Sequence, residues 1–208
     1  MNKKLNKGLL IVFEGIDGCG KSTQAKLAYE YVINSGYEAV ALKEYTNGKW
    51  GQKIKELSQK GRENVTPYEE FELFRKDRIE DVELNIKPAL KSKKIIILDR
   101  YYFSSMAYQG GRGLDVKMIQ EENEKIAPIP DIVFYIRVDI NTGLKRILSN
   151  RKNQFDDFEK KTFLKNVMQI FDNMKFDYLI TIDGDREVDT IQQEIKSHID
   201  KLIKKYST

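Results

Sequence analysis

The stretch Leu9-Leu-Ile-Val-Phe13, with Gly15-Ile-Asp-Gly-Cys-Gly-Lys-Ser22 shortly after it, decides the fold. The apolar run predicts a buried strand, the octapeptide fits the pattern G-x-x-x-x-G-K-[ST], and a helix-period segment follows at 22–35. In this order, the glycines let backbone N–H groups turn toward phosphate oxygens, and the N-terminus of the helix adds positive potential. The sequence therefore predicts a phosphate-binding loop (P-loop) at residues 15–22. A chance glycine-rich turn before a helix is the alternative.

Two side chains of this loop carry the predicted chemistry. Lys21 is placed for the β- and γ-phosphates of ATP, and the hydroxyl of Ser22 for Mg²⁺. These residues point to phosphoryl transfer with ATP as the donor and Mg²⁺ as the cofactor. Cys19 suits a tight loop because its side chain is small, and a redox-sensing thiol is the alternative. The predicted ATP-binding residues of this region are Gly15, Ile16, Asp17, Gly18, Cys19, Gly20, Lys21, Ser22 and Thr23.

Asp17 places a carboxylate inside a loop that is expected to bind polyphosphate. A negative charge there is electrostatically costly unless it faces a hydroxyl, a cation or an arginine. We therefore expect Asp17 to contact the second substrate. An exposed aspartate in a turn is the alternative, because aspartate is a common turn residue.

The rest of the chain alternates short apolar runs with longer amphipathic ones. Continuously apolar strands separated by helices are typical of a parallel sheet that is buried on both faces, with ligands at the carboxyl ends of its strands. The expected strands are 9–13, 38–43, 94–98, 132–138 and 178–182. The expected helices are 22–35, 51–60, 67–91, 114–126, 142–150, 158–175 and 188–205. The predicted fold class is α/β: a three-layer P-loop NTPase fold whose five-stranded parallel sheet is flanked by helices.

Length and charge narrow the organisation and the partners. The chain has 208 residues and 40% hydrophobic composition, which favours a single domain over residues 1–208. Its 36 Lys and Arg are interleaved with 32 Asp and Glu, so no nucleic-acid partner is expected, because such binders more often concentrate charge in one stripe. The apolar run 9–13 is too short for a signal peptide or a membrane span, which predicts a cytosolic protein without a membrane partner.

The chain contains one cysteine, Cys19, and one histidine, His198. A single cysteine excludes an intrachain disulfide and fits a reducing compartment. A single histidine, in a polar C-terminal helix, argues against both a zinc site built on histidines and a catalytic triad.

A second acid follows the strand predicted at 94–98. The run Ile95-Ile-Ile-Leu98 leads into Asp99-Arg100, and an apolar strand that ends in aspartate is typical of the position that orients Mg²⁺ or its water. Asp99 and Ser22 are therefore the candidate metal residues. Arg100 cannot lose its charge and offers a planar fork suited to a phosphate near the transferred group. The alternative is that Asp99 and Arg100 simply pair with each other.

Phe74 and Arg78 are four residues apart in the helix predicted at 67–91, so they share one helical face. An aromatic plane beside a guanidinium suits a planar base with a carbonyl edge, which stacks on the first and accepts hydrogen bonds from the second. The alternative is a core position for Phe74, because phenylalanine at helical spacing is usually buried.

The run from Asp99 to Gly110 reads D-R-Y-Y-F-S-S-M-A-Y-Q-G and resembles the D-R-Y-x-x-S-S-x-A-Y-Q-G signature of the thymidylate kinase family. The resemblance extends over essentially the whole chain. Its other matching segments are the P-loop run Phe13 to Thr23, Leu73-Phe74 with Asp77-Arg78, Pro88-Ala-Leu90, and Pro130-Asp131. The D-R-Y to Y-Q-G run is much more specific than the P-loop, which many families share.

The resemblance implies how an acceptor nucleotide is bound. Phe74 would stack on thymine, and Arg78 would donate hydrogen bonds to its carbonyl edge. Ser105 and Gln109 would contact the base. Tyr108 would pack under the deoxyribose and disfavour a 2′-hydroxyl.

The resemblance also implies contacts with the phosphates and with ATP. Arg100 would hold the acceptor phosphate, and Asp17 would approach the acceptor's 3′-hydroxyl and phosphate. Arg146 would lie against adenine, and the loop from Asp183 to Arg186 would pass the adenine edge. Members of the family resemble one another in forming homodimers and in having a parallel sheet of five strands.

The chain departs from the family pattern after the second expected strand. The family usually has R-E-P or F-P there, whereas this chain reads Lys43-Glu-Tyr-Thr46. Lys43 supplies the charge of an arginine toward the acceptor phosphate without its bidentate fork.

A second departure lies in the short lid at about 150–158. Many bacterial members read R-G-E-x-D-R-F-E there, whereas this chain has Asp157 in place of the arginine before F-E. Because the P-loop carries no arginine, Arg151 and Lys152 are the candidate lid cations that neutralise transition-state charge. The alternative for both is an ordinary solvated position at a helix end.

Taken with the resemblance, these features predict in-line transfer of the γ-phosphoryl group from Mg·ATP to the phosphate of dTMP, giving dTDP for dTTP biosynthesis. The expected catalytic residues are Asp17, Lys21, Arg100, Arg151 and Lys152. One alternative is a kinase for another nucleoside or nucleoside monophosphate, which the departure at 43–46 would favour. The other is a P-loop switch that binds nucleotide without phosphorylating an acceptor, which the residues from Phe74 to Gln109 disfavour.

Overall fold

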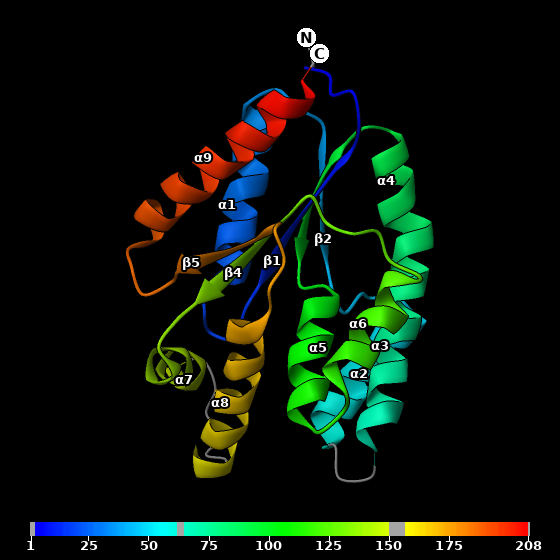
Figure 1. Cartoon of the computed structure of the whole chain (residues 1–208), viewed down its shortest axis with the longest axis vertical. Coiled ribbons are helices and arrows are strands. Elements are labelled where there is room, and N and C mark those ends of the chain that lie inside the picture. Colours follow the sequence, from blue (N-terminus) through cyan, green and yellow to red (C-terminus); the bar gives the residue numbers. More distant parts are fainter. Residues whose placement is uncertain (1–2, 62–64, 150–156, 208) are drawn as a thin grey trace.

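The computed structural model describes residues 3–61, 65–149 and 157–207. At its centre is a five-stranded parallel sheet in the order β2-β3-β1-β4-β5 (Figure 1). The strands are β1 (Leu9–Glu14), β2 (Ala39–Lys43), β3 (Ile95–Asp99), β4 (Ile132–Arg137) and β5 (Leu179–Asp183). Phe13 and Lys43 both lie opposite Asp99 in the strand register, so β1, β2 and β3 end level with one another. The α/β class with a parallel five-stranded sheet is confirmed.

Helices cover both faces of the sheet and make the outer two layers. α1 (Lys21–Asn34) and α9 (Val188–Tyr206) lie together on one side, and α4 (Lys87–Lys91) and α5 (Tyr102–Gly111) lie on the other (Figure 1). The remaining helical elements are α2 (Lys49–Lys60), α3 (Pro67–Asp81), the π-helical turn η1 (Val82–Ile86), α6 (Val116–Glu124), α7 (Ile140–Ser149) and α8 (Asp157–Asn173). The helix predicted at 67–91 is thus confirmed as one continuous run through α3, η1 and α4.

The start of this run shows why it is a helix. Pro67 occupies the first turn, where its missing N–H costs nothing. The Thr66 hydroxyl accepts from the Glu69 N–H at 3.2 Å, and the Glu69 carboxylate accepts from the Thr66 N–H at 2.9 Å. This reciprocal capping box satisfies two N–H groups that a helix end leaves unpaired.

The sequence predicts no helix at 102–111, yet α5 forms there. No side chain next to its start caps it. Instead the carboxylate of Glu14, at the end of β1, accepts from the N–H groups of Tyr101 at 2.7 Å and of Ser104 at 3.1 Å. Because this cap comes from a strand 87 residues earlier, nothing in the local sequence marks the start of α5.

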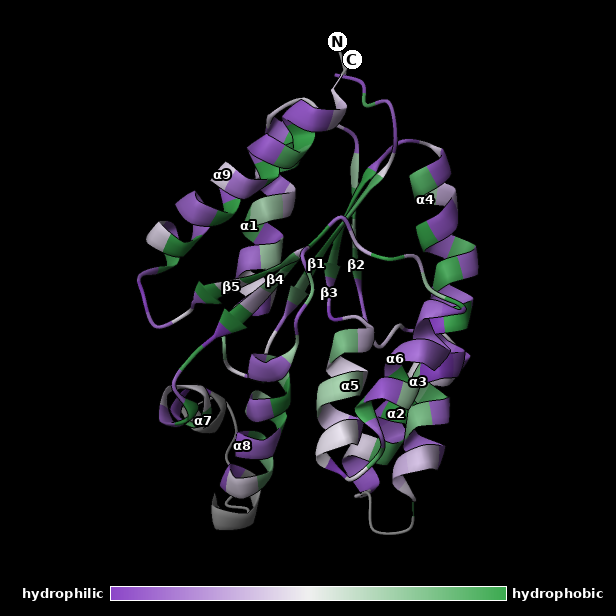
Figure 2. Ribbon diagram, viewed as in Figure 1, coloured by the Kyte–Doolittle hydropathy of each residue, from purple (hydrophilic) through white to green (hydrophobic). Residues whose placement is uncertain are grey.

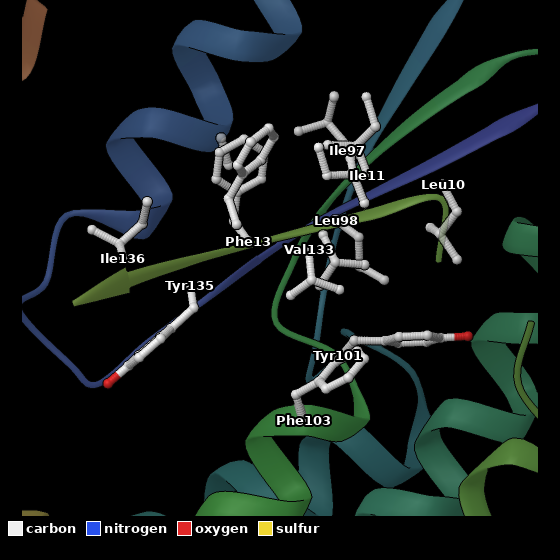
Figure 3. Packing of buried hydrophobic residues seen from close by; sticks show 14 of the residues in the cluster. Leu10, Ile11, Phe13, Ile97, Leu98, Tyr101, Phe103, Val133, Tyr135 and Ile136 are labelled. Atoms are coloured by element: carbon white, nitrogen blue, oxygen red, sulfur yellow. The ribbon is translucent and has the colours of Figure 1, made fainter. Parts of the chain in front are cut away.

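The core lies on both faces of the sheet, as the apolar strands require. All six residues of β1 and all five of β3 are buried, and the strands are the most uniformly hydrophobic elements of the molecule (Figure 2). Ile11 and Phe13 point to the α1 side, whereas Val133, Tyr101 and Phe103 pack toward α5 (Figure 3). This two-sided burial fixes the strand ends that carry the site.

The two ends of the described chain lie close together (Figure 1). Leu5 forms an antiparallel bridge with Ser207, and Lys3 forms a parallel bridge with Tyr37. No helix among the described residues is long and apolar enough to span a membrane.

Candidate active site

The backbone of the P-loop depends on its glycines. Gly15, Gly18 and Gly20 have φ values of 141°, 78° and 96°, in the region that residues with a side chain rarely adopt. A Cβ at Gly15 would also lie only 2.6 Å from the carbonyl oxygen of Ile136 and 2.7 Å from the sulfur of Cys19. The loop therefore needs glycine at Gly15 for space as well as for conformation.

Lys21 is held across the P-loop. Its ammonium donates to the carbonyl oxygen of Ile16 at 3.2 Å and lies 3.6 Å from the Asp17 carboxylate. Only 6% of the residue is exposed. Burial and the nearby Arg100 lower the pKa of Lys21. The ammonium is largely shielded from water and still has N–H donors to offer. Phosphate oxygens can accept hydrogen bonds from them.

Ser22 and Asp99 meet where α1 begins and β3 ends. The Ser22 hydroxyl donates to Asp99 Oδ2 at 2.5 Å, and Lys43 Nζ lies 3.7 Å from the same oxygen. Asp99 Oδ1 is buried and has no hydrogen-bond partner among the described residues. A hydroxyl beside a carboxylate with a spare oxygen fits Mg²⁺, which prefers oxygen ligands. The described residues contain no group of three His, Cys, Asp or Glu that could hold a metal alone, so other oxygens must complete the shell.

Arg100 faces the P-loop from the start of the α5 region. Its backbone has a φ of 74°, an uncommon left-handed conformation for a residue with a side chain. Its guanidinium donates to Asp17 Oδ1 at 2.6 Å and to Ser104 Oγ at 2.8 Å, and lies over the Tyr108 ring at 5.3 Å. Arg100 thus contacts Asp17 and not Asp99, which pairs with Ser22 and Lys43 instead.

Glu14 is a site residue that the sequence reasoning missed. Besides capping α5, the Glu14 carboxylate accepts a hydrogen bond from Ser104 Oγ at 2.6 Å. Ser104 Oγ in turn accepts one from Arg100. Glu14 is fully buried, and burial raises the pKa of its carboxyl group, although Arg100 acts in the opposite direction. The signal in the sequence was a charged residue at the end of an apolar strand, directly before the P-loop.

A cleft of about 1,410 Å³ runs along the carboxyl ends of β2 and β3. The structure brings into its lining all eight residues that were predicted to bind the acceptor: Asp17, Lys43, Phe74, Arg78, Arg100, Ser105, Tyr108 and Gln109. Ser22 and Asp99 line it as well. Its volume is ample for a nucleotide.

The deep end of the cleft is built around a buried ion pair. Arg78, only 1% exposed, donates from Nε to Glu44 Oε1 at 2.9 Å and from Nη2 to Glu44 Oε2. It also donates to Asn123 Oδ1 at 2.5 Å and to Ser105 Oγ at 3.3 Å. Burial raises the pKa of Glu44 to about 7, although the charge of Arg78 acts in the opposite direction. The Tyr101 ring lies 5.6 Å from the guanidinium carbon.

Phe74 is half-buried beside this pair. Its ring meets the Tyr45 ring edge-on, with 6.3 Å between the centroids. Both rings line the cleft, so Phe74 is not confined to the core. The two aromatic rings offer an apolar wall next to the polar Arg78.

The segment after β2, where the chain departs from the family pattern, is fastened to α3. Thr46 donates to the Asp77 carboxylate twice, from its N–H at 2.8 Å and from its hydroxyl at 2.6 Å. The Glu44–Tyr45 peptide bond within it is cis. The two hydrogen bonds from Thr46 to Asp77 hold the neighbouring Lys43 and Glu44 at the cleft. Lys55 of α2 also lines the cleft, and no motif in the sequence marked it.

The residues predicted on the ATP side are less closely grouped. Arg146 of α7 donates to the Gly18 carbonyl oxygen at 3.4 Å, which places it beside the P-loop. Asp183 ends β5, in register with Arg137, and does not line the cleft. The candidate lid cations Arg151 and Lys152 lie outside the described residues.

Comparison with known proteins agrees with this geometry. The family model for thymidylate kinase matches residues 13–195. A thymidylate kinase of Desulfotalea psychrophila is 42% identical over 199 residues, which cover 96% of this chain and 98% of the relative. A probable thymidylate kinase of Archaeoglobus fulgidus is 37% identical over 195 residues, covering 94% and 96%, and a thymidylate kinase of Akkermansia muciniphila is 38% identical over 190, covering 91% and 90%. The chain belongs to the thymidylate kinase family.

Proposed function

We propose that the cleft holds dTMP with its base against Phe74 and Arg78 and its phosphate next to the P-loop, where ATP binds. As a member of its family, the enzyme phosphorylates dTMP to dTDP, and the family uses ATP. The observation that carries the proposed placement is that all eight predicted acceptor residues line one cleft that also reaches Ser22 and Asp99.

At the deep end, Arg78 would read the base. A guanidinium has five N–H donors, and four are engaged by Glu44, Asn123 and Ser105 among the described residues. One N–H on Nη1 is left, and it can only donate. A carbonyl oxygen of thymine can accept it, whereas the amino group of cytosine at the same position cannot.

At the shallow end, the cations would hold the reacting phosphates. Arg100, kept in place by Asp17 and Ser104, and the lysines 43 and 55 would face the acceptor phosphate, and Lys21 would face the γ-phosphate. No general base is required, because the acceptor is already an anion. Catalysis then reduces to positioning and charge stabilisation.

Ser22 and Asp99 would hold Mg²⁺, directly or through water, with the phosphate oxygens of ATP completing its shell. The ion would supply charge neutralisation at the β- and γ-phosphates. Its support is the spare oxygen of Asp99 next to the Ser22 hydroxyl. Removal of Mg²⁺ with EDTA should abolish ADP formation, and added Mg²⁺ should restore it.

Three broader features belong to the same proposal: a single domain over residues 1–208, a cytosolic location and a homodimer. Leu84 and Ile129 keep 66% and 59% of their surface exposed in the single chain, which leaves apolar area for a second copy. Light scattering coupled to size-exclusion chromatography tests the dimer by mass.

A coupled ADP-release assay tests the proposed function. Mg·ATP is offered with dTMP, dUMP, UMP, dCMP, AMP, GMP or thymidine in turn. We expect dTMP to be much the best acceptor and thymidine, which has no phosphate, to be inactive. If ATP binds but no monophosphate accelerates ADP formation, the acceptor cleft has been assigned wrongly.

A further inference from the structure

Asn123 lies on α6, outside every motif of the sequence, and is completely buried. Its carboxamide makes two hydrogen bonds within the part of the chain that the structure describes. Oδ1 accepts from Arg78 Nη1 at 2.5 Å, and Nδ2 donates to the Ile119 carbonyl oxygen at 2.7 Å. Because Ile119 offers an acceptor and Arg78 offers only donors, the amide can satisfy both neighbours in one orientation alone.

The partners of Arg78 come from different parts of the fold. Glu44 follows β2 and binds the Nε and Nη2 edge of the guanidinium, whereas Asn123 binds Nη1 from α6. Ser105 Oγ also accepts from Nη2, at 3.3 Å, so without Asn123 the partners among the described residues would all lie on Nε and Nη2. A guanidinium held only there can still rock about that edge. A partner on Nη1 removes this freedom and decides where the remaining Nη1 hydrogen points.

We infer that Asn123 is a positioning residue, which orients Arg78 so that its last N–H meets the carbonyl edge of the acceptor base. The inference rests on the proposed role of Arg78 in reading that base. Without Asn123, Arg78 keeps its charge and its pair with Glu44. It loses the fixed direction of the donor that discriminates the base, and pre-organised donors bind more tightly than mobile ones.

A merely structural role would look different. The backbone carbonyl oxygen of Asn123 accepts from the N–H groups of Ile126 and Ala127 at the end of α6, and any residue at this position can make those bonds. Loss of a buried side chain alone would lower the thermal midpoint. It would not change the ranking of acceptors, and its effect would add to that of a change at Arg78.

The test is a double-mutant cycle with Asn123→Ala, Arg78→Ala and the double variant, measured as kcat/KM for dTMP and for dCMP. In the wild-type background we expect Asn123→Ala to lower kcat/KM for dTMP by about tenfold, mainly through KM, and to reduce the preference over dCMP. In the Arg78→Ala background, Asn123→Ala should lower neither kcat/KM for dTMP nor the preference over dCMP any further. Gln120→Ala, on the same helix, is the matched control and should change nothing, because the Gln120 amide donates to Glu124 and not to Arg78 among the described residues.

Equal losses in both backgrounds, or an unchanged preference for dTMP, would overturn the inference while leaving the role of Arg78 intact. If Arg78→Ala itself leaves the preference unchanged, the base-reading proposal and this inference fall together. Asn123→Ser, which keeps a small polar side chain, repeats the cycle if the alanine variant does not fold.

Discussion

The P-loop and the deep end of the cleft both hold a buried cation, but they assemble it differently. Lys21 bonds to Ile16, five residues away, within a loop shaped by its own glycines. Arg78 bonds to Glu44, 34 residues earlier, and to Asn123, 45 residues later. Among the described residues, the Lys21 ammonium makes one hydrogen bond and lies 3.6 Å from the Asp17 carboxylate, which leaves donors for phosphate. Arg78 has four of its five donors engaged by the described residues.

This difference fits two different tasks, stabilising the transferred phosphoryl group at Lys21 and discriminating the acceptor base at Arg78. A cation meant to stabilise transferred charge needs donors free for the reacting phosphates. A cation that discriminates one base edge needs its available donor fixed in direction. Several hydrogen-bond partners are required to hold it so. Changes at Lys21 should therefore affect the rate with little effect on the fold, and changes around Arg78 should affect stability and acceptor choice together.

The largest expected effect is that of Lys21→Ala on catalysis. We expect kcat to fall by about 10³-fold or more, because a phosphate-binding cation at the transferred group is lost. The thermal midpoint should change little, since the described residues give the ammonium one hydrogen bond and one ion contact, with the exposed carboxylate of Asp17. Steady-state kinetics and thermal melts measure both. Lys117→Ala, at an exposed lysine of α6, is the control. A kcat of Lys21→Ala within tenfold of the wild-type value would show that Lys21 does not stabilise the transferred phosphoryl group.

At the deep end, Glu44→Ala should act first on stability. It leaves the charge of Arg78 buried without its carboxylate, which typically costs about 3–5 kcal/mol. Chemical denaturation gives this free energy of unfolding. Glu56→Ala, which breaks the exposed pair with Lys60, should cost no more than about 0.5 kcal/mol. Similar losses in the two variants would mean that Glu44 and Arg78 are not a buried pair in solution.

A smaller effect is expected on the pH dependence of stability. The pKa of Glu44 is raised from 4.5 to about 7 by burial, so the folded protein binds more protons than the unfolded chain between these values. Its contribution to stability is present in full below pH 4.5 and is lost as the pH rises to about 7, by up to about 1.4 kcal/mol per pH unit. Unfolding measured at pH 5, 6 and 7 should show a flatter profile for Glu44→Gln. An unchanged slope would remove Glu44 as the source.

The smallest effect is expected at Cys19. Its thiol is buried against Gly15 in the P-loop, and burial raises its pKa, so it should stay protonated and unreactive at neutral pH. Iodoacetamide should modify the native enzyme far more slowly than the unfolded chain. Equal rates, with activity lost in step, would support the redox-sensing alternative instead. Cys19→Ala should change kcat by no more than about twofold.

The parts of the fold that sequence could predict are those that depend on neighbours along the chain. Strands β1 and β3 are recognisable because buried parallel strands are continuously apolar, and α3 because Thr66, Pro67 and Glu69 start it locally. Helix α5 was not predicted because Glu14 caps it from another element, and two aromatic residues at its start do not by themselves favour a helix.

The same limit applies to the site. The P-loop and the strand-end Asp99 follow from residue type and spacing. The same kind of reasoning indicates four acceptor residues, Asp17, Phe74, Arg78 and Arg100. Ser105, Tyr108 and Gln109 are indicated only by the family signature. Glu14, Glu44 and Asn123 act through hydrogen bonds across 34 to 90 residues, and no spacing rule connects such positions. Lys55 reaches the cleft because α2 packs beside α3. This packing is again a tertiary contact that the local sequence does not indicate.

We propose above that Arg78 selects the base through one fixed N–H. The most direct test compares wild type and Arg78→Ala in kcat/KM for dTMP and for dCMP, in the same assay and with folded protein verified by thermal melts. The variant should lose about 10- to 200-fold in kcat/KM for dTMP and far less for dCMP, so that the preference for dTMP largely disappears. Equal losses on both acceptors would contradict it, because Arg78 would then support the cleft without reading the base.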